Sequence, residues 1–133
     1  MKKIVNLSLS IIFSIIFFSC SQQDGGWDDN IKLSRKTVEF SAAADSVLVT
    51  TGGISWWVNN VSVDSNGCKY YPGVTAEVDT FTIQHDCFIV KRRNKNTLFI
   101  KVDKNTQSIN RTITVCLEAG DYFDYVTVTQ KPI

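Results

Sequence analysis

The residues best suited to chemistry are a histidine and a cysteine two positions apart, His85 and Cys87. An imidazole raises the thiolate fraction of a neighbouring thiol, and the thiolate is the nucleophile of cysteine enzymes. Side chains two apart on a strand point to the same side, so these two could face each other. No signature of an oriented active site accompanies them. We therefore interpret His85 as a solvated loop histidine beside a structural cysteine, and we predict a protein that is not an enzyme.

Metal and cofactor motifs are missing from the sequence. The chain has one histidine, no Cys-x-x-Cys pair and no Asp-x-Asp-x-Asp loop, which are the patterns of zinc and calcium sites. Gly52-Gly53 and Ala119-Gly120 lack the strand-to-helix setting of a phosphate-binding loop. We predict neither a metal nor a cofactor.

The densest run of charge is Lys91-Arg92-Arg93, followed closely by Lys95. On an alternating strand Lys91 and Arg93 would lie on one side and Arg92 on the other, so the run is not one continuous patch. Such a run is typical of a solvated turn, or of an edge strand protected against pairing with other chains. We favour that interpretation over its functional alternative, a site for a sulfated or sialylated glycan.

Aromatic side chains are the residues that a sugar-binding surface needs, because a pyranose ring packs its apolar face on an exposed aromatic ring. Trp56 and Trp57 are adjacent, so on a strand they point to opposite faces. Trp56 shares its side with Ile54 and Val58 and is expected in the core. Trp57 is then left on the outer face, beside Ser55 and Asn59.

Three tyrosines lie near turns, where binding residues tend to collect. Tyr70 and Tyr71 precede Pro72-Gly73, and Tyr122 follows Asp121. Together with Trp57 they are the predicted ligand-binding residues. The alternative is that each packs against a loop with its polar end in water.

A period of two residues recurs from Ile31 onward, whereas no stretch shows a helical period. Turn signals such as Gly52-Gly53, Asn94-Lys95-Asn96 and Ala119-Gly120-Asp121 separate the alternating runs. The alternating apolar residues are Val38, Phe40, Val47, Val49, Ile54, Trp56, Val58, Val61, Val63, Phe81, Ile83, Phe88, Val90, Leu98, Ile100, Val102, Ile113, Val115, Leu117, Phe123, Tyr125, Val126 and Val128. Many short strands without helices predict an all-β fold, an antiparallel β-sandwich of about seven to nine strands, and we place an immunoglobulin-like sandwich first.

The N-terminus has the three parts of a secretory signal. Lys2 and Lys3 precede an apolar stretch that ends at Phe18, and Ser19 and Cys20 follow. The stretch is shorter than the roughly 20 residues that cross a bilayer as a helix. The segment Phe17-Phe18-Ser19-Cys20 resembles the lipobox of bacterial lipoproteins, although its phenylalanines are bulkier than usual. We expect residues 1–19 to be removed, and lipid on Cys20 to attach the protein to the membrane.

The mature protein is then a polar tether over residues 20–30 and one domain over residues 31–133. Loss of Lys2 and Lys3 leaves 12 Lys and Arg against 13 Asp and Glu, which gives no electrostatic reason to expect nucleic acid as a partner. Three cysteines remain once Cys20 carries lipid. A disulfide between Cys68 and Cys87 is one alternative, and three small apolar residues in or near the core is the other.

The order of residues also resembles the BACON domain, an immunoglobulin-like module of cell-surface lipoproteins and glycoside-degrading systems of gut bacteria. The most characteristic pieces are Asn105 with Asn110-Arg111-Thr112, and the terminal Val126-Thr127-Val128-Thr129-Gln130. Residues 64–96 depart from the family pattern. The resemblance implies a carbohydrate-binding or accessory role, proposed for the family from the proteins that contain it, and a spacer role is equally consistent with it.

We accordingly expect a non-catalytic lipoprotein of the cell envelope that presents a carbohydrate-binding or accessory surface. The alternative function is a structural spacer, or a module that docks to another envelope protein through an uncovered sheet edge. Asp24, Asp28 and Asp29 follow the lipid cysteine, and acidic residues there accompany surface export in some lipoproteins. This pattern slightly favours the outer surface of the outer membrane over the periplasm.

Overall fold

Alternation of apolar and polar residues produces nine strands in the computed structural model, which describes residues 28–64, 69–73 and 77–133. No helix occurs among these residues. The strands are β1 (Thr37–Phe40), β2 (Asp45–Thr50), β3 (Trp57–Val63), β4 (Lys69–Tyr70), β5 (Phe81–His85), β6 (Phe88–Asn94), β7 (Thr97–Val102), β8 (Arg111–Ala119) and β9 (Tyr122–Gln130).

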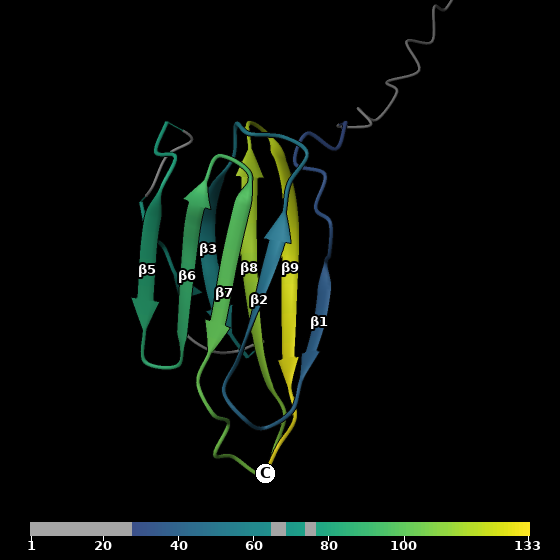
Figure 1. Ribbon diagram of the computed structural model, residues 1–133, viewed down its shortest axis with the longest axis vertical. Coiled ribbons are helices and arrows are strands. Elements are labelled where there is room, and N and C mark those ends of the chain that lie inside the picture. The colour runs from purple at the N-terminus through teal and green to yellow at the C-terminus, as the bar shows by residue number, and fades with distance from the viewer. Residues whose placement is uncertain (1–27, 65–68, 74–76) are drawn as a thin grey trace, which may run out of the picture.

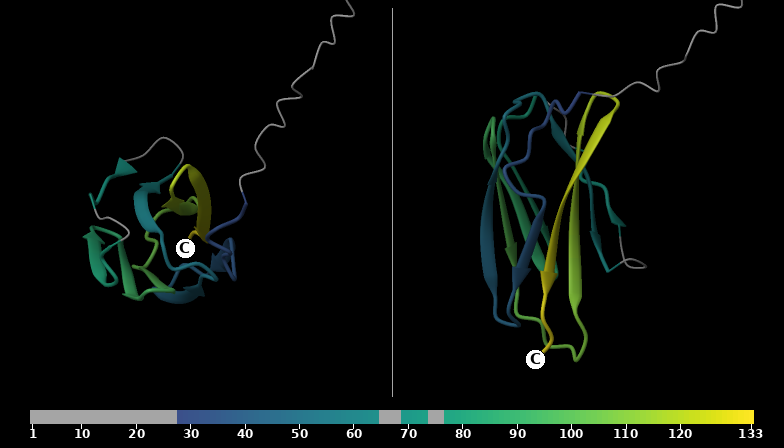
Figure 2. Two further views of the ribbon diagram at one scale, coloured as in Figure 1. Left: turned by 90° about the horizontal axis from the view of Figure 1, so that it is seen from above. Right: turned by 90° about the vertical axis from the view of Figure 1, so that its right-hand side faces the viewer.

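The strands form two sheets packed face to face. One has the order β1-β9-β8-β3-β4 and the other the order β2-β7-β6-β5. Figure 1 looks onto the four-stranded sheet, and the right-hand view of Figure 2 shows the two sheets as separate layers. Each layer is hydrophobic on the side that faces the other, so a single core lies between them.

The prediction of an immunoglobulin-like sandwich is confirmed. Strands β2, β7 and β6 have the positions of strands B, E and D of an immunoglobulin domain, and β3, β8 and β9 those of strands C, F and G. One detail of the prediction was wrong, because the sheets are not wholly antiparallel. Strand β1 pairs with β9 in parallel, with Thr37 opposite Thr127. The paired strands are the first and the last of the domain. Alternation within one segment cannot predict a pairing between segments so far apart in the chain.

Most of the alternating apolar residues are buried, and Trp56 lies in the core as predicted, fully buried. Its indole Nε1 donates a hydrogen bond to the Thr51 hydroxyl at 2.9 Å. The expectation that Ile54 shares its side with Trp56 was wrong, since Ile54 is 52% exposed. The strand begins only at Trp57, so the two-residue period does not extend back to Ile54.

The interpretation of the Lys91-Arg92-Arg93 run as a solvated turn or an edge strand was also wrong. The run lies in β6, which pairs with β5 on one side and β7 on the other. The alternation within the run is as predicted, but Arg92 points into the sandwich and is only 1% exposed. Its charge is accommodated by backbone carbonyl groups that the linear sequence does not bring near it.

Two β-bulges interrupt the ladders, one on β3 and one on β6. On β3 the register with β8 shifts between Val58 and Asn60, which leaves Asn59 without a partner in the ladder. On β6 the register with β7 shifts between Arg92 and Asn94, so Arg93 likewise has no partner in that ladder. Bulges bend a strand and change the direction of a side chain, and they are common beside functional sites.

Candidate functional site

The histidine and cysteine considered as a catalytic pair do not share a strand. His85 ends β5, Cys87 lies in the turn that follows, and β6 begins at Phe88. The imidazole stacks on Phe88 with ring centroids 5.5 Å apart and contacts the Tyr70 ring at 5.8 Å. Its Nδ1 is buried without a hydrogen-bond partner among the described residues. His85 is therefore part of an aromatic stack rather than the solvated loop histidine that we expected.

Cys87 is half-buried and packs against the core. Desolvation raises the pKa of its thiol, although the nearby positive charge of Arg111 acts in the opposite direction. A raised pKa lowers the thiolate fraction at neutral pH, which is the reverse of what a nucleophilic cysteine requires. Cys87 is a free thiol in the structure, which does not support the alternative of a bridge to Cys68. Cys68 itself lies outside the described residues.

The four aromatic residues predicted to bind a ligand do not come together. Trp57 lies on the outer side of β3, between the buried Trp56 and Val58. Tyr70 pairs with Val61 and so lies on the inner side of its sheet, where it contacts His85. The four residues thus point to different sides of the sandwich.

The other two tyrosines, Tyr71 and Tyr122, differ in burial. Tyr71 follows β4 and is exposed, whereas Tyr122 packs against the core at the start of β9. Burial raises the pKa of the Tyr122 hydroxyl, and the carboxylates of Asp124 and Asp29 add to the shift. A single binding surface made from Trp57, Tyr70, Tyr71 and Tyr122 does not exist in this fold.

Trp57 instead has aromatic neighbours that come from the other end of the sequence. It lies opposite Glu118 of β8, and Glu118 lies opposite Phe123 of β9. Tyr125 lies two residues further along β9 on the same side, opposite Cys116. We call Trp57, Phe123 and Tyr125 the aromatic strip. Phe123 and Tyr125 are 44% and 49% exposed, and Trp57 is half-buried.

Amide and carboxylate groups lie between the rings of the aromatic strip. The bulged Asn59 donates from Nδ2 to Glu118 Oε2 at 2.5 Å, and Asn60 donates from Nδ2 to Asn59 Oδ1 at 2.7 Å. These bonds fix the polar side chains beside Trp57. The pKa of the Tyr125 hydroxyl is raised, first by the ionisable Cys116 thiol that it contacts and then by partial burial.

This arrangement can pack apolar ring faces and form hydrogen bonds at the same time. Three aromatic side chains give flat apolar area on a rigid sheet, and Asn59, Asn60 and Glu118 offer both donors and acceptors. All three aromatic residues are paired with β8 in the ladder, which holds their backbone in place before any ligand binds. These are the properties that a surface for recognising a ligand needs.

Phe123 and Tyr125 were missed as candidate site residues, although both are in the alternating run of the last strand. The alternation of β9 could have identified them. Val126 and Val128 are expected on the inner face, so Phe123 and Tyr125, at odd-numbered positions of the same strand, are expected on the outer face. What could not be seen was that β8 places this side of β9 in line with Trp57 of β3.

Comparison with known proteins bears on the fold alone. No family model matches the sequence, and no curated protein matches it either. A solved structure, described as the NMR structure of a protein from Bacteroides thetaiotaomicron, superimposes with a TM-score of 0.61 at 22% identity. The match covers 77% of this chain and 87% of the other. The two proteins share an architecture.

Within residues 28–64, 69–73 and 77–133, no group of three or more His, Cys, Asp or Glu side chains is placed to hold a metal ion. Over the same ranges there is no helix of the length and hydropathy needed to cross a membrane.

Proposed function

We propose that this protein is a non-catalytic lipoprotein of the cell envelope that binds neutral carbohydrate through the aromatic strip on the outer face of the β1-β9-β8-β3-β4 sheet. The observation that carries the proposal is the alignment of Trp57, Glu118 and Phe123 across three neighbouring strands. Rings alternate there with groups that exchange hydrogen bonds with hydroxyls. This is the combination that recognition of a pyranose requires.

The polar residues of this face suit an uncharged ligand. Threonines occupy the same outer side further along the sheet, with Thr114 opposite Thr127 and Thr112 opposite Thr129. Their hydroxyls donate and accept hydrogen bonds and carry no charge. A chain of sugar units could extend from the aromatic strip along these threonines.

The lipid anchor on Cys20 and membership of the BACON family are part of the same proposal. The export signal and Cys20 lie outside the described residues, and their support is the sequence pattern of Lys2, Lys3, the apolar stretch and Ser19. Membership of the BACON family rests on the residues quoted for the resemblance. Placement on the outer membrane, with a slight preference for its outer surface, follows from the anchor and the aspartates after it.

The test is a glycan array probed with the purified protein, followed by affinity gel electrophoresis through the neutral polysaccharide that gives the strongest signal. We expect W57A and Y125A each to weaken binding by about tenfold or more, because buried aromatic contacts contribute about 1–2 kcal/mol each. Both side chains lie on the outer face, so the variants should still fold.

F99A is the matched control, because Phe99 is a half-buried aromatic residue on the outer face of the other sheet. It should bind as the wild type does. Equal losses in F99A and W57A would place the binding elsewhere. A blank array with well-folded protein would remove the carbohydrate function and leave the spacer or docking module as the better account.

A further inference from the structure

The opposite side of the sandwich carries positive charge. On the outer face of the β2-β7-β6-β5 sheet, Lys91 lies opposite Phe99, and Phe99 lies opposite Leu48. Arg93 follows Lys91 on the same side of β6, and Lys101 follows Phe99 on the same side of β7. We call Lys91, Arg93 and Lys101, together with Phe99, the basic face.

No carboxylate lies among the outward-pointing strand residues of this sheet. The remaining outward residues are uncharged, and they are Ser46, Leu48, Thr50, Thr82, Gln84, Ile89, Asn94 and Thr97. Asp45, at the start of β2, lies on the other side of the strand and accepts a hydrogen bond from the backbone N–H of Ser46 at 2.7 Å, and Asp79 is paired with Lys95 at 3.8 Å. The three cations of the basic face therefore form no ion pair with any described residue.

One of these cations is held in place. The guanidinium of Arg93 lies over the Phe99 ring, 4.2 Å from its centroid. Such a cation–π contact orients the planar guanidinium without neutralising it. Arg93 is also the residue at the β6 bulge, which sets the direction of its side chain apart from the regular ladder. Binding of an anion to Arg93 would therefore cost little side-chain conformational entropy, because the guanidinium is already held in one orientation.

The ordinary explanation for exposed lysine and arginine on a strand does not apply here. Charged residues protect edge strands from pairing with other chains. Strand β6 has partners on both sides, and so does β7. The cations lie in the middle of the sheet, where no edge needs protection.

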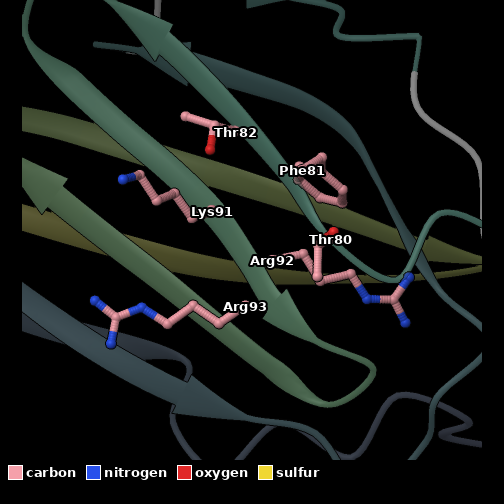
Figure 3. A pocket seen from close by; sticks show the side chains of 6 residues that line it. All are labelled: Thr80, Phe81, Thr82, Lys91, Arg92 and Arg93. Atoms are coloured by element: carbon pink, nitrogen blue, oxygen red, sulfur yellow. The ribbon is translucent and has the colours of Figure 1, made fainter.

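A shallow depression adjoins two of the cations (Figure 3). It is lined by Thr80, Phe81, Thr82, Lys91, Arg92 and Arg93. Figure 3 shows Lys91 and Arg93 extending from one side of β6 and Arg92 from the other. Thr82 lies opposite Lys91 in the ladder, so a hydroxyl group stands beside the ammonium group.

We propose that the basic face binds a polysaccharide that carries sulfate or carboxylate groups. Arginine and lysine pair with such anions, and arginine does so in a two-pronged geometry. Thr82 and Gln84 can bond to sugar hydroxyls, and Phe99 and Leu48 offer apolar area to ring faces. This site is on the other sheet from the aromatic strip and does not depend on the proposed function.

The composition of the face favours a polysaccharide over nucleic acid or an anionic membrane. Proteins that bind nucleic acid or an anionic membrane through charge carry a large net positive charge, whereas the formal net charge of this chain is only +1. Three cations spaced among hydroxyls, an amide and apolar side chains match a ligand whose charges are also spaced. Residues two apart on β6 are separated by about 7 Å along the strand.

The test measures binding of heparin, as a sulfated polysaccharide, by isothermal titration calorimetry, with unsulfated dextran as the uncharged comparison. We expect heparin to bind and dextran not to bind at this face. The triple variant K91Q/R93Q/K101Q should weaken heparin binding by about tenfold or more. Binding by the wild type should also fall as salt is raised, since the screening length is about 10 Å at 0.1 M.

The matched control is R35Q/K104Q/K131Q, which removes the same numbers of lysine and arginine charges from exposed positions elsewhere. It should retain heparin binding. A further variant, R93K, keeps the charge but loses the planar stack on Phe99 and should bind several-fold more weakly than the wild type. Circular dichroism of each variant separates a loss of binding from a loss of folding.

Three outcomes would overturn the proposal. Equal losses in the two triple variants would mean unspecific charge attraction. Dextran binding that falls in K91Q/R93Q/K101Q as much as heparin binding does would mean that the anions are not recognised. Binding of single-stranded DNA, or of vesicles made of equal parts phosphatidylcholine and phosphatidylglycerol, that depends on Lys91, Arg93 and Lys101 and exceeds heparin binding would assign the face to another class of partner. The W57A variant should bind heparin unchanged, which distinguishes this site from the aromatic strip.

Discussion

Arg92 is a charge placed inside a small hydrophobic core. Its guanidinium donates to the carbonyl oxygens of Trp56 at 2.8 Å, Ile54 at 2.5 Å and Lys95 at 2.7 Å, and it stacks on the Trp56 ring at 4.1 Å. Burial lowers the pKa of Arg92, but arginine remains charged at any pH of interest. The side chain thus joins β6 to the segment that leads into β3.

We predict that R92Q lowers the free energy of unfolding by about 3 kcal/mol, because it leaves buried carbonyl groups without donors. Its neighbour gives the control. R93Q removes an exposed guanidinium and should change stability by about 0.5 kcal/mol or less. Urea unfolding followed by tryptophan fluorescence measures both, and similar losses in the two variants would contradict a structural role for Arg92.

Asp29 gives a pH dependence whose sign follows from its contacts. Its carboxylate accepts hydrogen bonds from the backbone N–H of Lys32 at 2.6 Å and of Ile31 at 3.1 Å. The bond from Lys32 is the main reason that the pKa of Asp29 lies below 3.8 in the folded state. A carboxyl group with a lowered pKa stabilises the fold above its unfolded-state pKa, and that stabilisation is lost as the pH falls through the folded-state value.

We therefore expect the wild type to be more stable than D29N at neutral pH, and the difference to shrink as the pH is lowered below 3.8. The measurement is the free energy of unfolding in urea at a series of pH values. A difference that stays constant down to strongly acid pH would show that the charge of Asp29 does not contribute.

The loops at the C-terminal end of β9 are held together by buried polar side chains. Asn105 donates from Nδ2 to the carbonyl oxygens of Ile109 at 2.9 Å and Lys131 at 3.0 Å. Arg111 donates to Gln130 Oε1 at 2.6 Å and to the Asp103 carbonyl. Asn105, Arg111 and Gln130 are among the residues that carry the BACON resemblance, so those positions are explained by stabilising the sandwich rather than by binding a ligand.

N105A should destabilise the protein by about 2–3 kcal/mol, because it removes the donors from two carbonyl groups around a fully buried side chain. N110A changes the same residue type in the same quoted motif at an exposed position, and it should cost about 0.5 kcal/mol or less. Thermal unfolding followed by circular dichroism is sufficient to compare them. The role assigned to Asn105 would be abandoned if both variants melted together.

The two proposed binding surfaces lie on opposite faces of the sandwich, and a lipid on Cys20 would anchor both. Eight peptide units separate Cys20 from Asp28, so such a lipid would lie at most about 28 Å from the start of the described chain. A carbohydrate bound to either face would thus be held close to the membrane.

The anchor itself has a direct test. We expect C20S to be absent from the detergent-rich phase after Triton X-114 partition and to incorporate no labelled palmitate in cells, because the thiol that takes the lipid is gone. The wild type should enter the detergent-rich phase. If C20S entered it equally well, the protein would be held by another part of the chain and the lipobox assignment would be wrong.

The sequence alone determined the fold class and most of the core. A period of two residues is a local property, and burial of one face of each strand follows from it, as Val47, Val49, Val126 and Val128 show. It also set Trp57 outside, because Trp57 alternates with the inward-pointing Val58 of the same strand. The run Lys91-Arg92-Arg93 was divided correctly between two sides for the same reason.

The tertiary structure decided which outward residues become neighbours. Strand order brings Phe123 and Tyr125 into line with Trp57, whereas Tyr70 and Tyr122 lie on the inner side of the sheet. It also places β6 inside a sheet, which changes Arg92 from a solvated charge into a buried one. Strand order depends on pairing between residues far apart in the chain. The free energy of such pairing depends on the side chains of both strands, so the pattern of one segment alone cannot specify it.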